Sequence, residues 1–412
     1  MQYGLNGEKL GHSYSCELHA LIGGYPYELC EIAPDKLGEF LTKREFAAIN
    51  VTIPYKQAVI PYLDGISDAA RSIGAVNTIV RSDGKLFGYN TDFAGMEALI
   101  RKLGIDLRGT KTLILGSGGT SKTAAALTAK LGAREILRLS RNTVVGTVSY
   151  EEAYRRHTDA EIIINATPCG MFPNPNAQAI ELEPFTRLAG LVDAVYNPLR
   201  TKLVLDAQKR KIPAEGGLYM LSAQAVYASA LFLGREADES DIERAYRAVY
   251  DDKRNIALIG MPSSGKSTVG RLLAAKLGKV FFDSDEEIIK RIQMPIADYF
   301  ARYGEAEFRK QEKAVLAELT QSGGKVIATG GGAVLDEANI QALRRTGTLV
   351  FLDRSLDRLT ATPDRPLSSD AVALRRLFSE RYDRYITAAD VHVNADGELN
   401  ETVEIIIKEL EK

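Results

Sequence analysis

Gly260-Met261-Pro262-Ser263-Ser264-Gly265-Lys266-Ser267-Thr268 has the G-x-x-x-x-G-K-[ST] spacing of a phosphate-binding loop. The apolar run at 255–259 predicts a buried strand before it, and residues 269–277 carry apolar side chains at helical spacing after it. The motif requires this order of strand, loop and helix. We therefore predict a parallel α/β domain in which loop N–H groups and the start of a helix bind phosphate.

The loop contains the side chains that nucleotide chemistry needs. Lys266 is expected to reach the outer phosphates, and the Ser267 hydroxyl is expected to bind Mg²⁺. The alternative is a chance glycine-rich turn between a strand and a helix. The residues of the loop that we expect to bind ATP are Gly260, Ser263, Ser264, Gly265, Lys266, Ser267 and Thr268.

The composition is that of an ordinary globular protein with two to four domains in 412 residues. The net charge of −2, with acids and bases interspersed, gives no reason to expect a nucleic acid or a membrane surface as partner. Cys16, Cys30 and Cys169 lie far apart and form neither a zinc pattern nor a disulfide framework, which fits a reducing cytoplasm. The start of the chain lacks the basic-then-apolar order of a signal peptide.

The segment 216–234 has no charged residue and is close in length to a membrane span. It also contains Ser222, Gln224 and Ser229, so we expect a buried helix of a soluble core.

Polar side chains follow predicted strands and turns in the first hundred residues. Ser13 and Ser15 come after a short strand and could bind a polyol or a carboxylate, although Ser15 also suits the N-cap of the next helix. Lys56 follows a β-rich run that ends at Pro54, where a solvated surface lysine is the alternative. Asn77 and Asp92 lie at predicted strand or turn edges, where turn chemistry is the competing explanation.

From about residue 110 the pattern predicts the first half of a dinucleotide-binding unit. An apolar strand at 111–115 leads into the glycine-rich turn 116–121, an alanine-rich helix and a second strand at 134–139. Ser121 stands where the fingerprint has its third glycine, so a plain structural turn stays an alternative.

The end of the second strand indicates the cofactor. Ser140 and Arg141 stand where NAD binding calls for an acid, and an arginine suits a ribose 2′-phosphate. NADP is therefore favoured over NAD, with an ordinary exposed arginine as the alternative. Strands at 161–165 and 191–196, the uncharged helix around Gln224 and a charged helix to about residue 250 continue the unit.

A short charged boundary at 251–254 leads into the phosphate-loop domain. A strand at 280–285 ends in Asp283 and Asp285, of which the first could hold Mg²⁺ through water and the second could accept a hydroxyl proton. A strand at 326–329 runs into three glycines, which implies a close backbone approach. Residues 364–367 lie in a polar stretch long enough to move as a lid, and Arg381 and Tyr385 share one helical face.

These pieces resemble two known families. Residues 1 to about 250 resemble shikimate dehydrogenase in the motifs H-S-Y-S at 12–15, N-V-T-I-P-Y-K at 50–56, G-A-V-N-T at 74–78, N-T-D at 90–92, the glycine-rich turn at 116–121, N-A-T-P-C-G-M at 165–171, Y-N-P at 196–198 and G-L-Y-M-L-S-A-Q-A at 217–225. Residues 253–412 resemble shikimate kinase in the phosphate loop, D-S-D at 283–285, F-R-K-Q-E at 308–312, G-G-G at 330–332, R-P-L at 365–367 and R-Y-D-R-Y at 381–385.

The resemblance to the dehydrogenase implies roles for residues in the first part of the chain. Lys56 and Asp92 would be the catalytic pair. The substrate-binding residues would be Ser13, Ser15, Thr52, Lys56, Asn77, Asp92, Tyr196 and Gln224. The NADP-binding residues would be Gly116, Gly118, Gly119, Thr120, Ser121, Ser140, Arg141 and Met220.

The resemblance to the kinase implies a second site. Asp285 would act on the shikimate hydroxyl, and Arg309 and Arg381, with Gly331 and Gly332 nearby, would bind its carboxylate. Lys266 would be catalytic, Arg365 would be the lid arginine that stabilises phosphate charge, and Ser267 and Asp283 would hold the metal.

The chain departs from the two families in places. Lys9 and Cys16 stand where the dehydrogenase pattern has prolines, and the segment from Ser355 to Arg365 is several residues shorter than usual.

The sequence thus predicts an α/β enzyme with two activities. A substrate lobe at 1–100, completed by helices at about 218–250, and a Rossmann lobe at 101–217 would reduce 3-dehydroshikimate with NADPH. A P-loop α/β/α domain at 253–412 would phosphorylate shikimate with Mg-ATP. The expected partners are these small molecules, with no nucleic acid or membrane and the oligomeric state open. The alternatives are a metabolite-sensing regulator that has lost catalysis and a first enzyme that acts on quinate with NAD.

Overall fold

The computed structural model describes residues 2–11, 13–142, 144–360 and 370–412. The chain divides into two compact units, Met1–Tyr250 and Asp251–Lys412. The border falls inside a single helix, α9 (Ser240–Lys253), so the first three charged residues of the boundary are helical and only Arg254 separates the helix from the next strand.

The first unit opens with a mixed six-stranded sheet in the order β2-β1-β3-β5-β6-β4. Its strands are β1 (Tyr3–Gly7), β2 (Glu28–Glu31), β3 (Ala48–Val51), β4 (Gly65–Ile66), β5 (Thr78–Ser82) and β6 (Lys85–Tyr89). Its helices are α1 (Ser15–Gly23), α2 (Leu37–Lys43), α3 (Asp68–Ile73), α4 (Thr91–Lys102) and α8 (Leu218–Leu233), with 3-10 turns η1 (Pro34–Lys36) and η2 (Ile60–Tyr62).

The uncharged helix α8 lies against other helices of this part of the unit. It packs against α1 and α4, and Gly95 permits the contact with α4, because a β-carbon there would lie 2.6 Å from the Met220 carbonyl oxygen. Ser222 and Gln224 are buried in this helix, as expected for a helix that packs inside the core. Among the described residues, no helix is both long and apolar enough to cross a membrane.

The second sheet of this unit is wholly parallel, in the order β11-β10-β9-β7-β8. Its strands are β7 (Lys111–Leu115), β8 (Glu135–Leu139), β9 (Ile162–Asn165), β10 (Gly190–Asp193) and β11 (Ala214–Glu215), with helices α5 (Gly119–Lys130), α6 (Tyr150–Arg156) and α7 (Lys202–Lys209). The chain leaves β7 for β8 on one side and returns to β9 on the other. The glycine-rich turn after β7 therefore lies at the switch point where open α/β sheets bind ligands.

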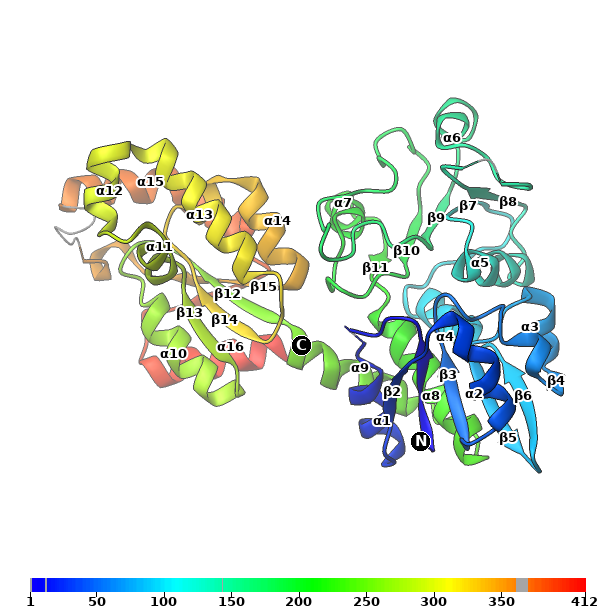
Figure 1. The fold of residues 1–412 in the computed structure, drawn as a ribbon. Coiled ribbons are helices and arrows are strands. Elements are labelled where there is room, and N and C mark those ends of the chain that lie inside the picture. The colour runs from blue at the N-terminus through cyan, green and yellow to red at the C-terminus, as the bar shows by residue number, and fades with distance from the viewer. Residues whose placement is uncertain (1, 12, 143, 361–369) are drawn as a thin grey trace. The chain divides into compact units, whose positions relative to one another are not determined.

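The second unit is a parallel five-stranded sheet, in the order β13-β14-β12-β15-β16, between two layers of helices (Figure 1). The strands are β12 (Asn255–Ile259), β13 (Val280–Asp283), β14 (Lys325–Ala328), β15 (Gly347–Asp353) and β16 (Val391–Asn394). The helices are α10 (Lys266–Leu277), α11 (Ser284–Ile292), α12 (Ile296–Tyr303), α13 (Glu305–Leu319), α14 (Glu337–Thr346), α15 (Ala371–Ala388) and α16 (Leu399–Leu410), with 3-10 turns η3 (Ala333–Leu335) and η4 (Leu356–Arg358).

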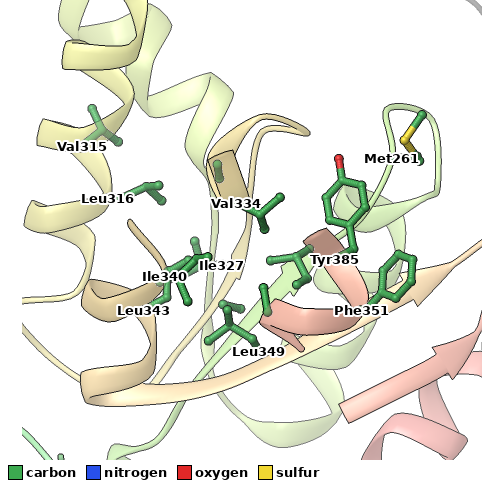
Figure 2. Packing of buried hydrophobic residues seen from close by; sticks show 14 of the residues in the cluster. Met261, Val315, Leu316, Ile327, Val334, Ile340, Leu343, Leu349, Phe351 and Tyr385 are labelled. Atoms are coloured by element: carbon green, nitrogen blue, oxygen red, sulfur yellow. The ribbon is translucent and has the colours of Figure 1, made fainter. Parts of the chain in front are cut away.

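Both faces of this sheet are buried, as a parallel sheet requires. Along β12, Ile259 faces a core with α13 and α14, while Ile256 and Leu258 face a second core with α10 and α16. Figure 2 shows the first core, where Phe351 of β15 lies beside Tyr385 of α15; their ring centroids are 5.3 Å apart. This contact fixes α15 over the carboxyl edge of the sheet.

Four local expectations need correction. The strand expected at 280–285 ends at Asp283, and Ser284 and Asp285 begin α11 because the Asp283 side chain caps that helix. Helix α10 begins at Lys266 and not at Val269, because Gly265, with φ of 90°, already serves as its N-cap. Ser15 is the first residue of α1 and not its cap; the Ser13 hydroxyl accepts from the Ser15 N–H instead. The strand expected at 191–196 ends at Asp193.

Asp193 explains that last difference. Its carboxylate is fully buried and accepts hydrogen bonds from the Val195 N–H (2.9 Å), the Asn165 side-chain amide (2.9 Å) and the Thr201 hydroxyl (2.6 Å). The bond to Val195 turns the chain out of the sheet. Asp193 thereby ties the end of β9 to the loop between β10 and α7. Burial raises the pKa of Asp193 to about 7, although the three hydrogen bonds favour its ionised form.

We predict that Asp193→Asn removes a pH dependence from the stability of the first unit. Because the folded carboxyl holds its proton up to about pH 7 and the unfolded one releases it near pH 4, this group makes folding less favourable as pH rises between those values. The free energy of unfolding should fall by about 2 to 3 kcal/mol from pH 5 to pH 8 through this group alone. Asparagine cannot ionise, so the variant should lose that fall. Urea titrations with hydrogen-exchange mass spectrometry on peptides of β9 and β10 measure it, with β12 peptides as reference. An unchanged pH slope in the variant would contradict the prediction.

We predict that Asn6→Val stabilises the first unit. Asn6 lies on β1 opposite Cys30 and Val51, has no exposed surface, and neither atom of its amide has a hydrogen-bond partner in the described part of the chain. Burying an unpaired amide costs about 1 to 3 kcal/mol, and valine removes that cost on a residue suited to a strand. The same hydrogen-exchange titration should show a higher free energy of unfolding for Asn6→Val and no gain for Asn6→Ser. A lower value for Asn6→Val would show that the amide is satisfied in solution.

Two candidate active sites

Lys56 and Asp92 form an ion pair in the first unit. The Lys56 Nζ lies 2.5 Å from the Asp92 Oδ2, and the side chains are 16% and 11% exposed. Lys56 comes from the loop after β3, whereas Asp92 lies in the first turn of α4. The Lys56 chain also passes 3.8 Å from the position that a β-carbon on Gly119 would take, at the start of α5. A charged, partly shielded ammonium therefore lies between the two lobes, next to the predicted dinucleotide turn.

Asn77 belongs to a buried hydrogen-bond network beside this pair. The Asn77 side-chain oxygen accepts from the Thr91 N–H at 2.7 Å, and its nitrogen donates to the Thr91 hydroxyl at 3.1 Å. The Thr91 hydroxyl also donates to the Gln224 side-chain oxygen at 3.5 Å, which connects α4 to α8. Three of the predicted substrate-binding residues, Asn77, Asp92 and Gln224, are thus brought together around Thr91.

The sequence interpretation did not single out Asn50, Thr78 and Thr91 as members of this network. The Asn50 amide donates to the Thr78 hydroxyl at 3.1 Å and to the Asn77 carbonyl, and its oxygen accepts from the Tyr27 hydroxyl at 2.8 Å. These residues lie next to predicted ones within the same short polar runs. A search for consecutive buried hydrogen-bonding residues at strand ends would have found them.

The remaining predicted substrate contacts come from three loops. The Ser13 hydroxyl donates to the Ser15 hydroxyl at 2.9 Å. The ring of Tyr196 lies 5.3 Å from that of Tyr14, so the loop after β10 reaches the paired serines. Thr52 follows β3, and its N–H donates to the Asn6 carbonyl at 2.9 Å. The structure thus pairs the two serines and brings the loop after β10 next to them.

A cavity of about 410 Å³ begins at Lys56 and extends over the glycine-rich turn. Its walls are the loop after β3, the turn after β7, the end of β8 and the loop after β9. The lining residues predicted for NADP are Gly116, Gly118, Gly119, Thr120, Ser140 and Arg141, and Tyr150 and Thr167 also line it. The positive charge of Arg141 acts on Tyr150, where it opposes the effect of burial, which raises the pKa of that phenol.

Two predicted cofactor residues do not line this cavity. Ser121 is fully buried, and its hydroxyl donates to the Gly116 carbonyl at 2.6 Å. A serine at the position of the third glycine therefore closes the turn from within. Met220 is buried in α8, where its carbonyl lies against Gly95 of α4.

The second unit has a cavity of about 750 Å³ over the phosphate loop. The Lys266 Nζ donates to the carbonyls of Gly260 and Met261 at 3.0 and 2.7 Å, which holds its charge inside the loop. The Ser267 hydroxyl donates to the Asp283 Oδ2 at 2.5 Å, and the Asp283 Oδ1 accepts from the Asp285 N–H. The predicted residues Ser263, Gly265 and Thr268 also line the cavity, whereas Ser264 is buried behind it.

Ser267 and Asp283 present a hydroxyl and a carboxylate oxygen side by side at the mouth of the loop. Oxygen donors of this kind suit Mg²⁺, which usually keeps several waters and binds the phosphates of its nucleotide. The chemistry of these two residues therefore fits the metal that the sequence predicts.

The three glycines after β14 face the charged residues of the cavity. A β-carbon on Gly332 would lie 2.1 to 2.4 Å from the Arg309 guanidinium, so only glycine leaves room for this arginine. The Arg309 guanidinium pairs with Glu312 at 2.8 Å and with Glu305 at 2.9 Å. Burial raises the pKa of Glu312, and the charge of Arg309 opposes that rise. Arg309 is thus fixed over the glycine turn.

Arg381 reaches the same turn from α15. Its Nη1 donates to the Gly331 carbonyl at 3.1 Å, and the Tyr385 hydroxyl donates to the same oxygen. Asp285 lines the cavity nearby, with its Oδ1 2.7 Å from the position of a β-carbon on Gly330. Two guanidinium groups and one carboxylate therefore converge beside the phosphate loop. Arg365, predicted as the lid arginine, lies outside the described residues.

Comparisons with known proteins identify both units. Residues 5–79 match the family model of the shikimate dehydrogenase substrate binding domain, and residues 262–411 match the shikimate kinase model. Over 263 residues the chain is 36% identical to the shikimate dehydrogenase (NADP(+)) of Clostridium perfringens strain SM101, covering 59% of this chain and 96% of that relative. The same enzyme of Halothermothrix orenii is 38% identical over 260 residues, covering 56% of this chain and 90% of the relative.

Solved structures agree for the first unit. The chorismate mutase/shikimate 5-dehydrogenase fusion protein of Clostridium acetobutylicum matches with a TM-score of 0.57 at 32% identity, covering 60% of this chain and 96% of that one. Shikimate 5-dehydrogenase of Thermus thermophilus, solved with NADP(H) and shikimate, matches with a TM-score of 0.54 at 30% identity, covering 60% and 99%. The chain therefore belongs to the shikimate dehydrogenase family over its first unit and carries a shikimate kinase domain in its second.

Proposed function

We propose that the first unit reduces 3-dehydroshikimate to shikimate with NADPH and that the second unit phosphorylates shikimate at its 3-hydroxyl with ATP. The observation that carries the first step is the 2.5 Å pair of Lys56 and Asp92 at the start of the cavity over the glycine-rich turn. The observation that supports the second is the convergence of Asp285, Arg309 and Arg381 beside the phosphate loop.

In the reduction, Lys56 donates a proton from its Nζ to the carbonyl oxygen of the substrate. Asp92 orients the ammonium and stabilises its charge before the transfer. A positioned general acid of this kind contributes about 10² to 10⁴ in rate. NADPH, when bound, supplies the hydride.

The polar residues around this pair bind the rest of the substrate. Ser13 and Ser15 suit the carboxylate, because two adjacent hydroxyls can donate to its two oxygens. Asn77, Thr52 and Gln224 suit the ring hydroxyls, and Tyr196 closes the site from the loop after β10. The network through Thr91 keeps Asn77 and Gln224 in place, since the side-chain oxygen of each accepts a hydrogen bond from Thr91.

The cofactor is NADPH in this proposal. The relatives are named for NADP(+), and the Thermus thermophilus structure contains NADP(H) and shikimate. In this chain, Arg141 lines the same cavity as Lys56 and would bind the ribose 2′-phosphate, with Ser140 beside it. The N–H groups of Ser121 and of the turn 116–120, at the start of α5, bind the pyrophosphate. Met220, which is buried in α8, is the remaining residue that the resemblance assigns to NADPH binding.

In the phosphorylation, Asp285 accepts the proton of the attacking hydroxyl, and Arg309 and Arg381 bind the carboxylate. Gly331 and Gly332 allow the ring to approach the backbone. The phosphate loop binds ATP, with Lys266 neutralising charge on the outer phosphates. Ser267 and Asp283 would hold Mg²⁺, which supplies charge stabilisation to the phosphates when bound. Arg365 would be the lid arginine that stabilises the charge of the phosphates.

The order of the two reactions explains their presence in one chain. The product of the first unit is the substrate of the second, so a covalent connection raises its local concentration near the second site. We place both reactions in the reducing cytoplasm, since Cys16, Cys30 and Cys169 are all free.

We predict that the two activities can be removed one at a time. Lys56→Ala should lower kcat for NADPH-dependent reduction about 10² to 10⁴-fold, because the proton donor is lost, and leave phosphorylation of added shikimate intact. Lys266→Ala should abolish phosphorylation and leave reduction intact. Loss of NADPH absorbance and formation of shikimate 3-phosphate are followed together, with Lys43→Ala as the exposed-lysine control. An intact chain that binds both substrates without turnover would favour a sensor.

We predict that Arg141→Ala weakens the binding of NADPH but not the binding of NADH. Losing a guanidinium bond to phosphate should raise KM for NADPH about 10-fold and leave KM for NADH unchanged. Steady-state kinetics with both cofactors measure this effect, and Arg155→Ala on the exposed face of α6 is the matched control. An equal rise in KM for NADPH and NADH would refute the assignment of Arg141 to the ribose 2′-phosphate. Turnover of quinate with NAD in preference to 3-dehydroshikimate with NADPH would support the alternative substrate.

A further inference from the structure

Arg354 lies beside the phosphate loop without belonging to any motif that the sequence interpretation used. It follows the last residue of β15, which is the direct neighbour of β12 in the sheet. Its side chain lines the 750 Å³ cavity. The Arg354 Nη1 lies 3.6 Å from the position that a β-carbon on Gly265 would take. A guanidinium group is thus in contact range of the last glycine before Lys266.

The hydrogen bonds of Arg354 set it apart from the other arginines of this site. Arg309 pairs with two glutamates, Arg381 donates to the Gly331 carbonyl, and Arg358 donates to the Asp396 carbonyl. The Arg354 Nε is buried and has no acceptor anywhere in the described part of the chain. Burying a guanidinium nitrogen without an acceptor costs free energy. The Nη1 end of the same group faces Gly265 in the cavity, where an oxygen-bearing anion would give the guanidinium a partner.

The position of Arg354 favours the phosphates of the nucleotide over the carboxylate of the acceptor substrate. The carboxylate of the acceptor substrate is assigned to Arg309 and Arg381, which both contact the glycines after β14. Arg354 contacts Gly265, where the loop N–H groups and the start of α10 are built to bind phosphate. A planar guanidinium matches two phosphate oxygens at once.

We propose that Arg354 binds the polyphosphate chain of the nucleotide in the second unit, next to Gly265. This inference rests on the proposed function, because it names a further residue for the same nucleotide. It also accounts for the short segment between Ser355 and Arg365. A shorter connection leaves fewer residues to contact the nucleotide, and an arginine at the strand end supplies positive charge from a rigid position.

The experiment uses the full chain and the variants Arg354→Ala and Arg354→Lys, with Arg376→Ala on the exposed face of α15 as matched control. Calorimetric titration with Mg-ADP and kinetic inhibition by tripolyphosphate, which has no base, report on the phosphate contact. We expect Arg354→Ala to raise the Kd of ADP and the inhibition constant of tripolyphosphate about 10-fold. Arg354→Lys should recover part of this loss. KM for shikimate and the dehydrogenase activity of the same sample should stay within about twofold of wild type.

Three results would overturn the proposal. An unchanged Kd for ADP would show that Arg354 does not contact the nucleotide. A raised Kd for ADP with an unchanged inhibition constant for tripolyphosphate would place Arg354 at the base of the nucleotide. A raised KM for shikimate alone would place it at the acceptor substrate. Because ADP binding needs no turnover, this measurement stays informative even if the chain does not phosphorylate shikimate, so the two proposals fail separately.

Discussion

Burial of parallel strands on both faces is the constraint on which the chemistry of both units depends. A parallel sheet covered by helices leaves no polar face, so its strands are apolar and only their ends and loops can carry reactive groups. All its strands also end at one edge. In the second unit this edge gathers Lys266 after β12, Asp283 at the end of β13, the glycines after β14 and Arg354 after β15. In the first unit the loops after β7, β8 and β9 form the cofactor cavity in the same way.

Glycines at two positions permit close contacts that bring functional side chains together at this edge. Gly95 lets α4 approach α8, so Asp92 and Gln224 come together although they are 132 positions apart in the chain. Gly332 leaves room for the Arg309 guanidinium. Buried polar groups also hold the loops by hydrogen bonds. Asp193 connects the end of β9 to the loop that carries Tyr196, and Ser121 closes the turn after β7. The hydrogen bonds of Asp193 and Ser121 each hold a loop at the edge of the sheet.

Much of this could be predicted from sequence, because the signals are local. Apolar runs predicted β7 to β10 in the first unit and β12 to β14 in the second, whereas β11, β15 and β16 were not predicted. The phosphate loop and the glycine-rich turn indicated where ligands are expected to bind. The resemblance of spaced motifs led to Lys56 and Asp92, which the structure pairs. What failed depended on contacts between distant residues. The end of β10 is decided by Asp193, whose three partners lie 2 to 28 positions away in the chain. Asn50 and Thr91 are distinguished by the buried hydrogen bonds that they make with distant segments. Arg354 follows an ordinary strand, and only its distance to Gly265 distinguishes it.

The two sites differ in charge as their proposed reactions require. Reduction of a ketone develops one negative charge on one oxygen, and one ammonium balanced by one carboxylate is enough to stabilise and protonate it. Phosphoryl transfer moves a group with several charged oxygens past a carboxylate-bearing acceptor, so the second cavity combines Lys266, Arg309, Arg354 and Arg381. Those cations would repel one another in the empty site. Asp283, Asp285 and Glu312 lie among them, and Glu312 is buried directly against Arg309. These acids offset part of the positive charge of the cavity. Among the four cations, Arg354 has a buried nitrogen for which the described residues provide no acceptor.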